Sequence, residues 1–309
     1  MRKLKYIIIL LILTQFTFGC STINYVKNLI LPKKVVEKVT KKLSIPVKKI
    51  YEYGKMAEVV YKDNASISEF ASKNNYQLLT INELLESEVK YFAIKKTGMQ
   101  YIVIRGTKNA NNIKSDITAI PMLDEITGIM MHKGFKDASL EIFSELKKLT
   151  STLKKGNKTT IIGHSLGGAI AAILGLYLYE NNYYIEQVVT FGQPKFTNEN
   201  GMKKYQSLPL IRIAGKGDVV VSVPPSSRFF EFIHSGLKVS LDNKKISYSK
   251  VGDEQNKIDD TPIEYSLDYL RSLDVKNHKM IYYLKRLKSN INKSIYIQFK
   301  EGYTWKRKK

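Results

Sequence analysis

One pentapeptide constrains the fold of this chain more than any other feature. Gly163-His164-Ser165-Leu166-Gly167 has the pattern G-x-S-x-G, between a β-branched run at residues 159–162 and a small-residue helical pattern at 166–179. A serine in such a strand-to-helix turn has an exposed hydroxyl, and the flanking glycines let strand and helix approach each other. The pattern therefore predicts a nucleophile elbow centred on Ser165. The alternative is a glycine-rich turn that only packs tightly.

The segments around this turn predict the fold class. Residues 91–96 and 100–105 have the pattern of a β-hairpin, and residues 135–153 carry apolar side chains at helical spacing. Further short strands are expected at 188–191 and 210–213. Strands that alternate with helices predict a mainly parallel central sheet with helices on both faces. Together with the elbow, this indicates an α/β-hydrolase fold.

The histidine that would activate the serine can be narrowed to two. Serine is a weak nucleophile without a base, and in this fold the acid and then the histidine follow the serine along the chain. The chain has four histidines, of which His132 and His164 precede Ser165. These two are expected to hold loops or to pack beside the elbow. His234 and His278 both satisfy the order.

The acid is expected at the carboxyl end of a strand. Asp218 lies in the loop after the strand expected at residues 210–213, and it is the predicted acid. Asp242 and Asp253 lie in a polar stretch between residues 242 and 261, where we expect solvated loop charges.

The N-terminus carries an export pattern. Residues 2–5 are mostly basic, and residues 6–18 form an apolar run that is shorter than the ~20 residues of a membrane-spanning helix. This arrangement is typical of a secretory signal. We therefore expect a signal peptide at residues 1–19, a basic tether at 20–50 and the α/β-hydrolase domain at 51–309.

Cys20 is the only cysteine of the chain, which excludes an internal disulfide. Its place directly after the apolar run resembles the end of a bacterial lipoprotein signal, although Thr17 stands where such signals usually carry leucine. The resemblance implies that Cys20 is lipidated and anchors the exported chain in the bacterial cell envelope. The alternative is ordinary signal cleavage, which would give a secreted protein with an incidental thiol.

Five short blocks of sequence carry a family resemblance. In chain order they are I-R-G-T at 104–107, H-K-G-F at 132–135, G-H-S-L-G-G at 163–168, T-F-G-Q-P at 190–194, and G-D-V-V at 217–220 with a proline pair at 224–225. Over residues 50–290 the chain resembles the class 3 (fungal-lipase-like) lipases, a family that includes phospholipases A1 and feruloyl esterases.

The resemblance assigns roles to particular residues. Family members often carry a non-catalytic histidine soon after the proline pair, where His234 lies, so the resemblance implies His278 as the base. It also implies that the backbone N–H groups of Thr107 and Leu166 receive the oxyanion. Ile104 stands where the family usually has phenylalanine.

These inferences combine into one functional hypothesis. A Ser165-His278-Asp218 triad would cleave acyl esters of lipids through an acyl-enzyme, as a lipase or phospholipase A1 at a membrane surface. The mechanism needs no cofactor, and the sequence shows no metal-ligand spacing. One alternative is a carboxylesterase acting on soluble esters. The other is a non-catalytic envelope lipoprotein that uses the fold for binding.

The net charge of the chain indicates which kind of surface or substrate it binds. The net charge of +22 comes from lysines spread along the whole chain, which favours an anionic membrane surface and phospholipid over neutral fat. A lysine-rich host proteome would explain the charge equally well. No nucleic-acid-binding motif accompanies the lysines, so we expect no nucleic-acid partner.

Two segments are ambiguous from the sequence alone. Residues 120–131 either touch lipid or pack in the core. Residues 295–309 mix aromatic and basic side chains, as in an edge strand or an interfacial patch.

Overall fold

The computed structural model describes residues 43–84, 87–106, 120–148, 153–224, 230–243, 245–248 and 275–297. The chain divides into two compact units, Met1–Lys41 and Lys42–Lys309, and all described residues belong to the second. Within these ranges no helix combines the length and the apolar character that a membrane span requires. The expected signal peptide and Cys20 lie outside the described residues.

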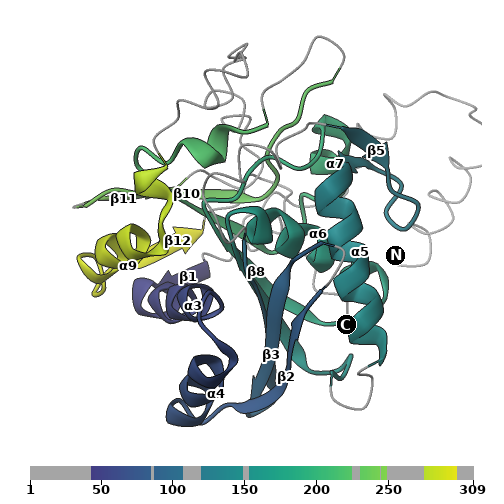
Figure 1. Ribbon diagram of the computed structural model, residues 1–309. Helices are drawn as coiled ribbons and strands as arrows, with labels where there is room; N and C mark the ends of the chain where they lie inside the picture. Colours follow the sequence, from purple (N-terminus) through teal and green to yellow (C-terminus); the bar gives the residue numbers. More distant parts are fainter. Residues whose placement is uncertain are drawn as a thin grey trace, which may run out of the picture. The chain divides into compact units, whose positions relative to one another are not determined.

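An eight-stranded sheet forms the centre of the second unit (Figure 1). Its middle strands are parallel, namely β4 (Met99–Ile104), β7 (Lys158–His164), β8 (Ile185–Phe191), β9 (Leu210–Gly215) and β10 (Leu237–Leu241). Antiparallel strands lie at both edges: β3 (Lys90–Lys96) and β2 (Gln77–Glu83) beyond β4, and β11 (Ile246–Tyr248) beyond β10. The predicted α/β-hydrolase fold with a mainly parallel sheet is confirmed.

Helices cover both faces of the sheet. On one face lie α5 (Lys133–Lys148) and α6 (Leu166–Glu180), and on the other α3 (Val47–Val59) and α9 (Met280–Lys288). Successive residues of a strand point to opposite faces, so Ile161 of β7 packs with α5 and α6 while Ile162 packs with α3 and α9. The other α-helices of the described residues are α4 (Asn64–Lys73) and α7 (Glu199–Lys204).

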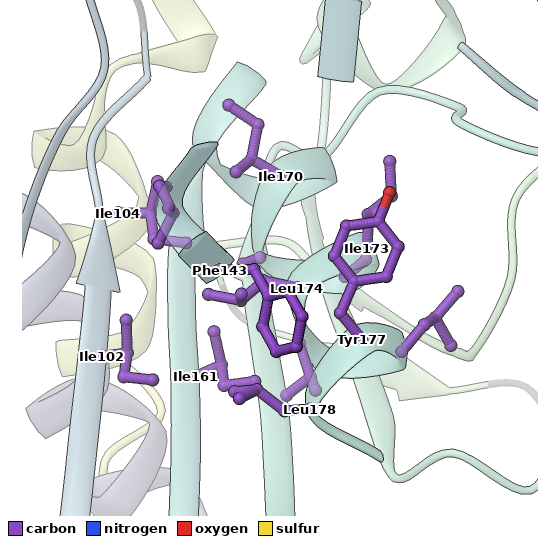
Figure 2. Packing of buried hydrophobic residues seen from close by; sticks show 14 of the residues in the cluster. Ile102, Ile104, Phe143, Ile161, Ile170, Ile173, Leu174, Tyr177 and Leu178 are labelled. Carbon is purple, nitrogen blue, oxygen red and sulfur yellow. The ribbon is translucent and has the colours of Figure 1, made fainter. Parts of the chain in front are cut away.

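The helix that follows the elbow is the most deeply buried. All residues of α6 from Gly167 to Leu178 are buried, which is possible because its small side chains let α5 and the sheet approach closely. Figure 2 shows Leu174 and Tyr177 beside Phe143 of α5, and Ile170 at the end of the helix nearer Ile104. The turn that carries Ser165 is therefore followed directly by a buried, closely packed stretch of helix.

The boundary of the expected tether was wrong. Residues 43–50 belong to the folded unit: β1 (Leu43–Pro46) pairs antiparallel with β12 (Ser294–Ile297), and α3 follows directly. Ile45, Val47 and Ile50 are buried, and this burial fixes the segment to the domain. The pattern of buried apolar residues was not recognised in the sequence, because the exposed lysines at positions 48 and 49 interrupt it.

The segment at residues 120–131, for which the sequence left lipid contact and core packing open, packs partly in the core, and its contact with lipid stays a prediction. It forms a small hairpin of β5 (Pro121–Leu123) and β6 (Met130–His132). Ile129 and Met131 pack in the core, whereas Leu123 is 59% exposed and Ile120 is 48% exposed. Of the C-terminal segment, residues 295–297 form part of β12, which is the edge-strand alternative. Residues 298–309 lie outside the described ranges.

Candidate active site

Ser165 occupies the strained turn between β7 and α6. Its backbone has φ 60° and ψ −136°, a conformation that side chains other than glycine rarely adopt and that costs about 1–3 kcal/mol. The turn is tight, because a β-carbon on Gly163 would lie 2.0 Å from the Gly167 carbonyl oxygen. The N–H of Ser165 donates to the carbonyl of Phe191 at 2.9 Å, so the adjacent strand β8 holds the turn in place.

A histidine and an aspartate from distant parts of the chain meet in the same region. His278 ends the short 3-10 helix η5 (Lys276–His278), and Asp218 is the N-cap of η3 (Val219–Ser222) after β9. The Nδ1 atom of His278 lies 2.9 and 3.0 Å from the two carboxylate oxygens of Asp218. Both side chains are buried, so the pair is shielded from water.

The Asp218 carboxylate is held as an anion. Burial alone would raise its pKa, but the neighbouring His278 ring, with its hydrogen bond, holds the pKa below the ordinary value. The Tyr283 hydroxyl donates to Oδ2, and the Val220 N–H donates to Oδ1 at 2.9 Å. Hydrogen bonds to the charged form of a carboxylate favour that form.

The Ser165 hydroxyl, which the sequence predicts to be exposed, is buried in the structure, as is the Nε2 atom of His278. Among the described residues, neither Ser165 Oγ nor His278 Nε2 has a hydrogen-bond partner, although both atoms are buried. Buried polar atoms are normally paired, so the two unpaired atoms are free to bond to each other or to a ligand. Hydrogen bonds between catalytic groups often tighten only when substrate binds.

The other histidines are buried in different surroundings. His234 Nε2 lies 2.7 Å from the Val221 carbonyl, and burial, followed by the nearby Arg212 cation, holds its pKa well below the ordinary value. The His132 ring stacks on Phe135 with centroids 4.0 Å apart. The structure thus pairs His278, and not His234, with Asp218.

Two of the remaining expected residues, Leu166 and Asp242, lie within the described ranges. Leu166 is the first residue of α6. Asp242 accepts a hydrogen bond from Lys216 Nζ at 3.1 Å in a partly exposed ion pair, as expected for a loop charge. Thr107 and Asp253 lie outside the described residues. Among the described residues, His, Cys, Asp and Glu side chains form no cluster of three that could hold a metal ion.

Sequence reasoning missed two residues of α9 that support the loops carrying Asp218 and His278. Tyr283 donates to Asp218 and accepts a hydrogen bond from the Gly215 N–H at 3.0 Å. Arg286 Nη2 donates to the Lys216 carbonyl and to Asn277 Oδ1, each at 3.0 Å. No sequence motif predicts these contacts. The spacing of the two residues could have done so, because residues 283 and 286 lie on one face of a helix that begins just after His278.

A nucleophile elbow on a mainly parallel sheet, with a His–Asp pair at the ends of the following elements, defines the α/β-hydrolase class. Comparison with known proteins gives a narrower result. Residues 101–228 match the model of the family described as Lipase (class 3). A lipase of Rhizomucor miehei is 31% identical over 147 residues, 44% of this chain and 40% of that protein. A phospholipase A1-II 1 of Oryza sativa subsp. indica is 30% identical over 122 residues, 37% of this chain and 30% of that protein.

Solved structures show the same fold. A triacylglycerol lipase whose catalytic centre is described as a serine-protease triad superposes with a TM-score of 0.59 at 21% identity, covering 77% of this chain and 95% of that one. A Rhizomucor miehei lipase propeptide complex gives a TM-score of 0.63 at 21% identity, with 81% and 83% covered. The chain spans less than half the length of the first curated relatives it matches. These matches support the resemblance to class 3 lipases.

Proposed function

We propose that this chain is a serine hydrolase that cleaves acyl esters of lipids. The proposal is carried by the strained elbow serine, Ser165, and the buried His278–Asp218 pair, whose histidine ring stacks on the residue before Ser165 at 4.6 Å. Among the described residues, Ser165 Oγ and His278 Nε2 are both unpaired. The similarity to lipases and phospholipases A1 supports the same function.

The three side chains have distinct roles in this proposal. His278 Nε2 takes the proton of the Ser165 hydroxyl as Oγ attacks the ester carbonyl carbon. Asp218 accepts the hydrogen bond from Nδ1–H, which fixes the tautomer and stabilises the imidazolium. The protonated His278 then gives its proton to the departing alcohol, and a water molecule activated by the same ring hydrolyses the acyl-enzyme.

The oxyanion of the tetrahedral intermediate needs donors beside the elbow. The Leu166 N–H lies at the first position of α6, where the helix dipole favours negative charge. Thr107 is the proposed second donor. Arg105 supports the chain just before it, because its Nη2 donates to Glu83 Oε1 at 3.0 Å and to the Glu88 carbonyl at 2.8 Å.

We propose phospholipid in an anionic membrane as the substrate. Exposed apolar side chains at Ile120, Leu123 and Ile126 offer a surface that can contact lipid, and the net charge of +22 favours anionic lipid. Some of the similar proteins carry the name phospholipase A1-II. Lipidation of Cys20 would hold the exported domain at the bacterial envelope membrane.

The test compares the chain with Ser165→Ala on three substrates: anionic phospholipid vesicles, triglyceride emulsion and a dispersed short-chain ester. We expect the fastest fatty-acid release from the vesicles, and a fall in kcat of about 10⁶ in the variant. Ser139→Ala is the matched control, because this serine is buried in α5 and donates only to backbone carbonyls.

Other outcomes separate the alternatives. Equal activity of Ser165→Ala and the unmodified chain would refute the mechanism. A folded protein that neither hydrolyses any ester nor reacts with a fluorophosphonate probe would be a binding module. Highest activity on the dispersed ester, with no gain at vesicles, would indicate a carboxylesterase acting on soluble substrates.

A further inference from the structure

A chain of hydrogen bonds connects three segments of the site that are far apart in the sequence. The Gly106 N–H lies 3.1 Å from the Tyr61 hydroxyl oxygen, and that oxygen lies 2.7 Å from His164 Nδ1. His164 Nε2 lies 2.8 Å from the carbonyl oxygen of His278. We call Tyr61 and His164 the relay pair.

With a neutral His164 ring, only one arrangement of protons satisfies all of these contacts. The His278 carbonyl can only accept, so His164 donates from Nε2–H; Nδ1 of the neutral ring then accepts from the Tyr61 hydroxyl, whose oxygen accepts from the Gly106 N–H. His164 therefore carries its proton on Nε2 and donates to the His278 carbonyl. Burial lowers the pKa of His164 to about 3, with the neighbouring His278 ring contributing further, so the ring stays neutral as this arrangement requires.

The relay pair lies against the proposed catalytic groups. Gly106 is the last described residue before position 107, and a β-carbon on it would lie 2.7 Å from Ser165 Cβ. The His164 ring stacks on the His278 ring with centroids 4.6 Å apart. The Tyr61 ring meets His164 edge-on at 5.6 Å. The two members of the pair together therefore contact the strand end, the elbow and the base segment: Tyr61 contacts Gly106 and His164, and His164 contacts His278.

We propose that Tyr61 and His164 are positioning residues, which hold the main chain of Gly106 and of His278 in register with Ser165. The proposal rests on the catalytic roles given above. Neither residue transfers a proton to substrate. Their effect comes from geometry, since a misplacement of about 1 Å in a catalytic constellation can cost about 10²-fold in rate.

Two kinds of substitution separate the halves of the relay. Tyr61→Phe removes only the hydroxyl and keeps the ring. His164→Asn places an acceptor near the Nδ1 position but has no donor for His278, whereas His164→Gln does the reverse. Tyr53→Phe is the matched control, because Tyr53 is a buried tyrosine of α3 whose ring packs against Tyr101.

We expect Tyr61→Phe to lower kcat by about 10- to 100-fold and to leave KM unchanged. The concentration of active enzyme used to calculate kcat is measured by titration with a fluorophosphonate. The double variant Tyr61→Phe/His164→Asn should lose no more than the worse single variant, because groups that act as a unit are not additive. Tyr53→Phe should retain its kcat. A Tyr61→Phe variant with wild-type kcat, or losses that multiply in the double variant, would overturn the proposal.

A second readout is independent of activity. In ¹⁵N-histidine NMR, His164 should be the neutral Nε2–H tautomer, and Tyr61→Phe should shift its Nδ1 signal while Tyr53→Phe leaves it in place. The opposite tautomer would refute the relay. A protein that shows the expected NMR signals but hydrolyses no ester would refute the proposed function and leave the relay intact.

Discussion

Lowering the pH from 7 to 5 is expected to destabilise this protein through two buried histidines. Burial is the main cause that lowers the pKa of His164 to about 3 and the pKa of His234 well below its ordinary value. In an unfolded chain both rings titrate near pH 6.5. The unfolded state therefore binds more protons below that pH, and stability falls as the pH falls.

The magnitude follows from the linkage between protonation and folding. One histidine that stays neutral in the folded state lowers the free energy of unfolding by about 2 kcal/mol between pH 7 and pH 5, at ~1.36 kcal/mol per pH unit below the unfolded pKa. Two such rings give about 4 kcal/mol, which is a large part of the roughly 5–15 kcal/mol that holds a domain folded. For His164 the loss continues to about pH 3, where the folded state also takes up the proton.

The assay is urea unfolding at pH 7 and at pH 5, for the unmodified chain and for His234→Gln. Glutamine keeps an N–H to donate to the Val221 carbonyl, which His234 Nε2 approaches to 2.7 Å, but glutamine does not titrate. The variant should lose about 2 kcal/mol less than the unmodified chain over this interval. Equal losses in the two proteins would refute the view that His234 is held neutral by burial.

Two further predictions concern the His278–Asp218 pair. Tyr283→Phe removes the hydroxyl that donates to Asp218 and leaves the buried Gly215 N–H without its acceptor, so the free energy of unfolding at pH 7 should fall by about 1.5–3 kcal/mol, and an unchanged urea midpoint would contradict this. Gly192→Ala would place a β-carbon 2.7 Å from Asp218 Oδ2 and 2.8 Å from His278 Cε1, so kcat should fall by about 10²-fold. Gly98→Ala carries similar backbone strain, at φ 73°, with no atom within 4 Å, and should keep its kcat.

The parts of this fold that could be predicted from sequence are those with local signals. The elbow was visible because the strand, the G-x-S-x-G turn and the small-residue helix are consecutive at residues 158–180. The β3–β4 hairpin was visible for the same reason. By contrast, β1 has only four residues, and its partner β12 lies about 250 residues further along the chain. No local sequence pattern therefore predicted this pairing.

The candidate site likewise has residues that could be predicted from the sequence and residues that could not. The order of residues left His234 and His278 open as partners of Asp218, and only the family resemblance favoured His278. The structure separates them by packing, since His234 faces the Val221 carbonyl while His278 faces the carboxylate. Tyr61 could not be found from the sequence, because its contacts with Gly106 and His164 depend on where the turn after α3 meets the sheet.

The pairing of β1 with β12 also determines how the domain responds to force. Leu43 is opposite Ile297, and Pro46 is opposite Ser294, so residues 43 and 297 leave the ladder at the same end. A load pulling these two positions apart would peel the ladder open one pair at a time. The first event under tension would be the release of this small ribbon, while the large sheet still carries no load.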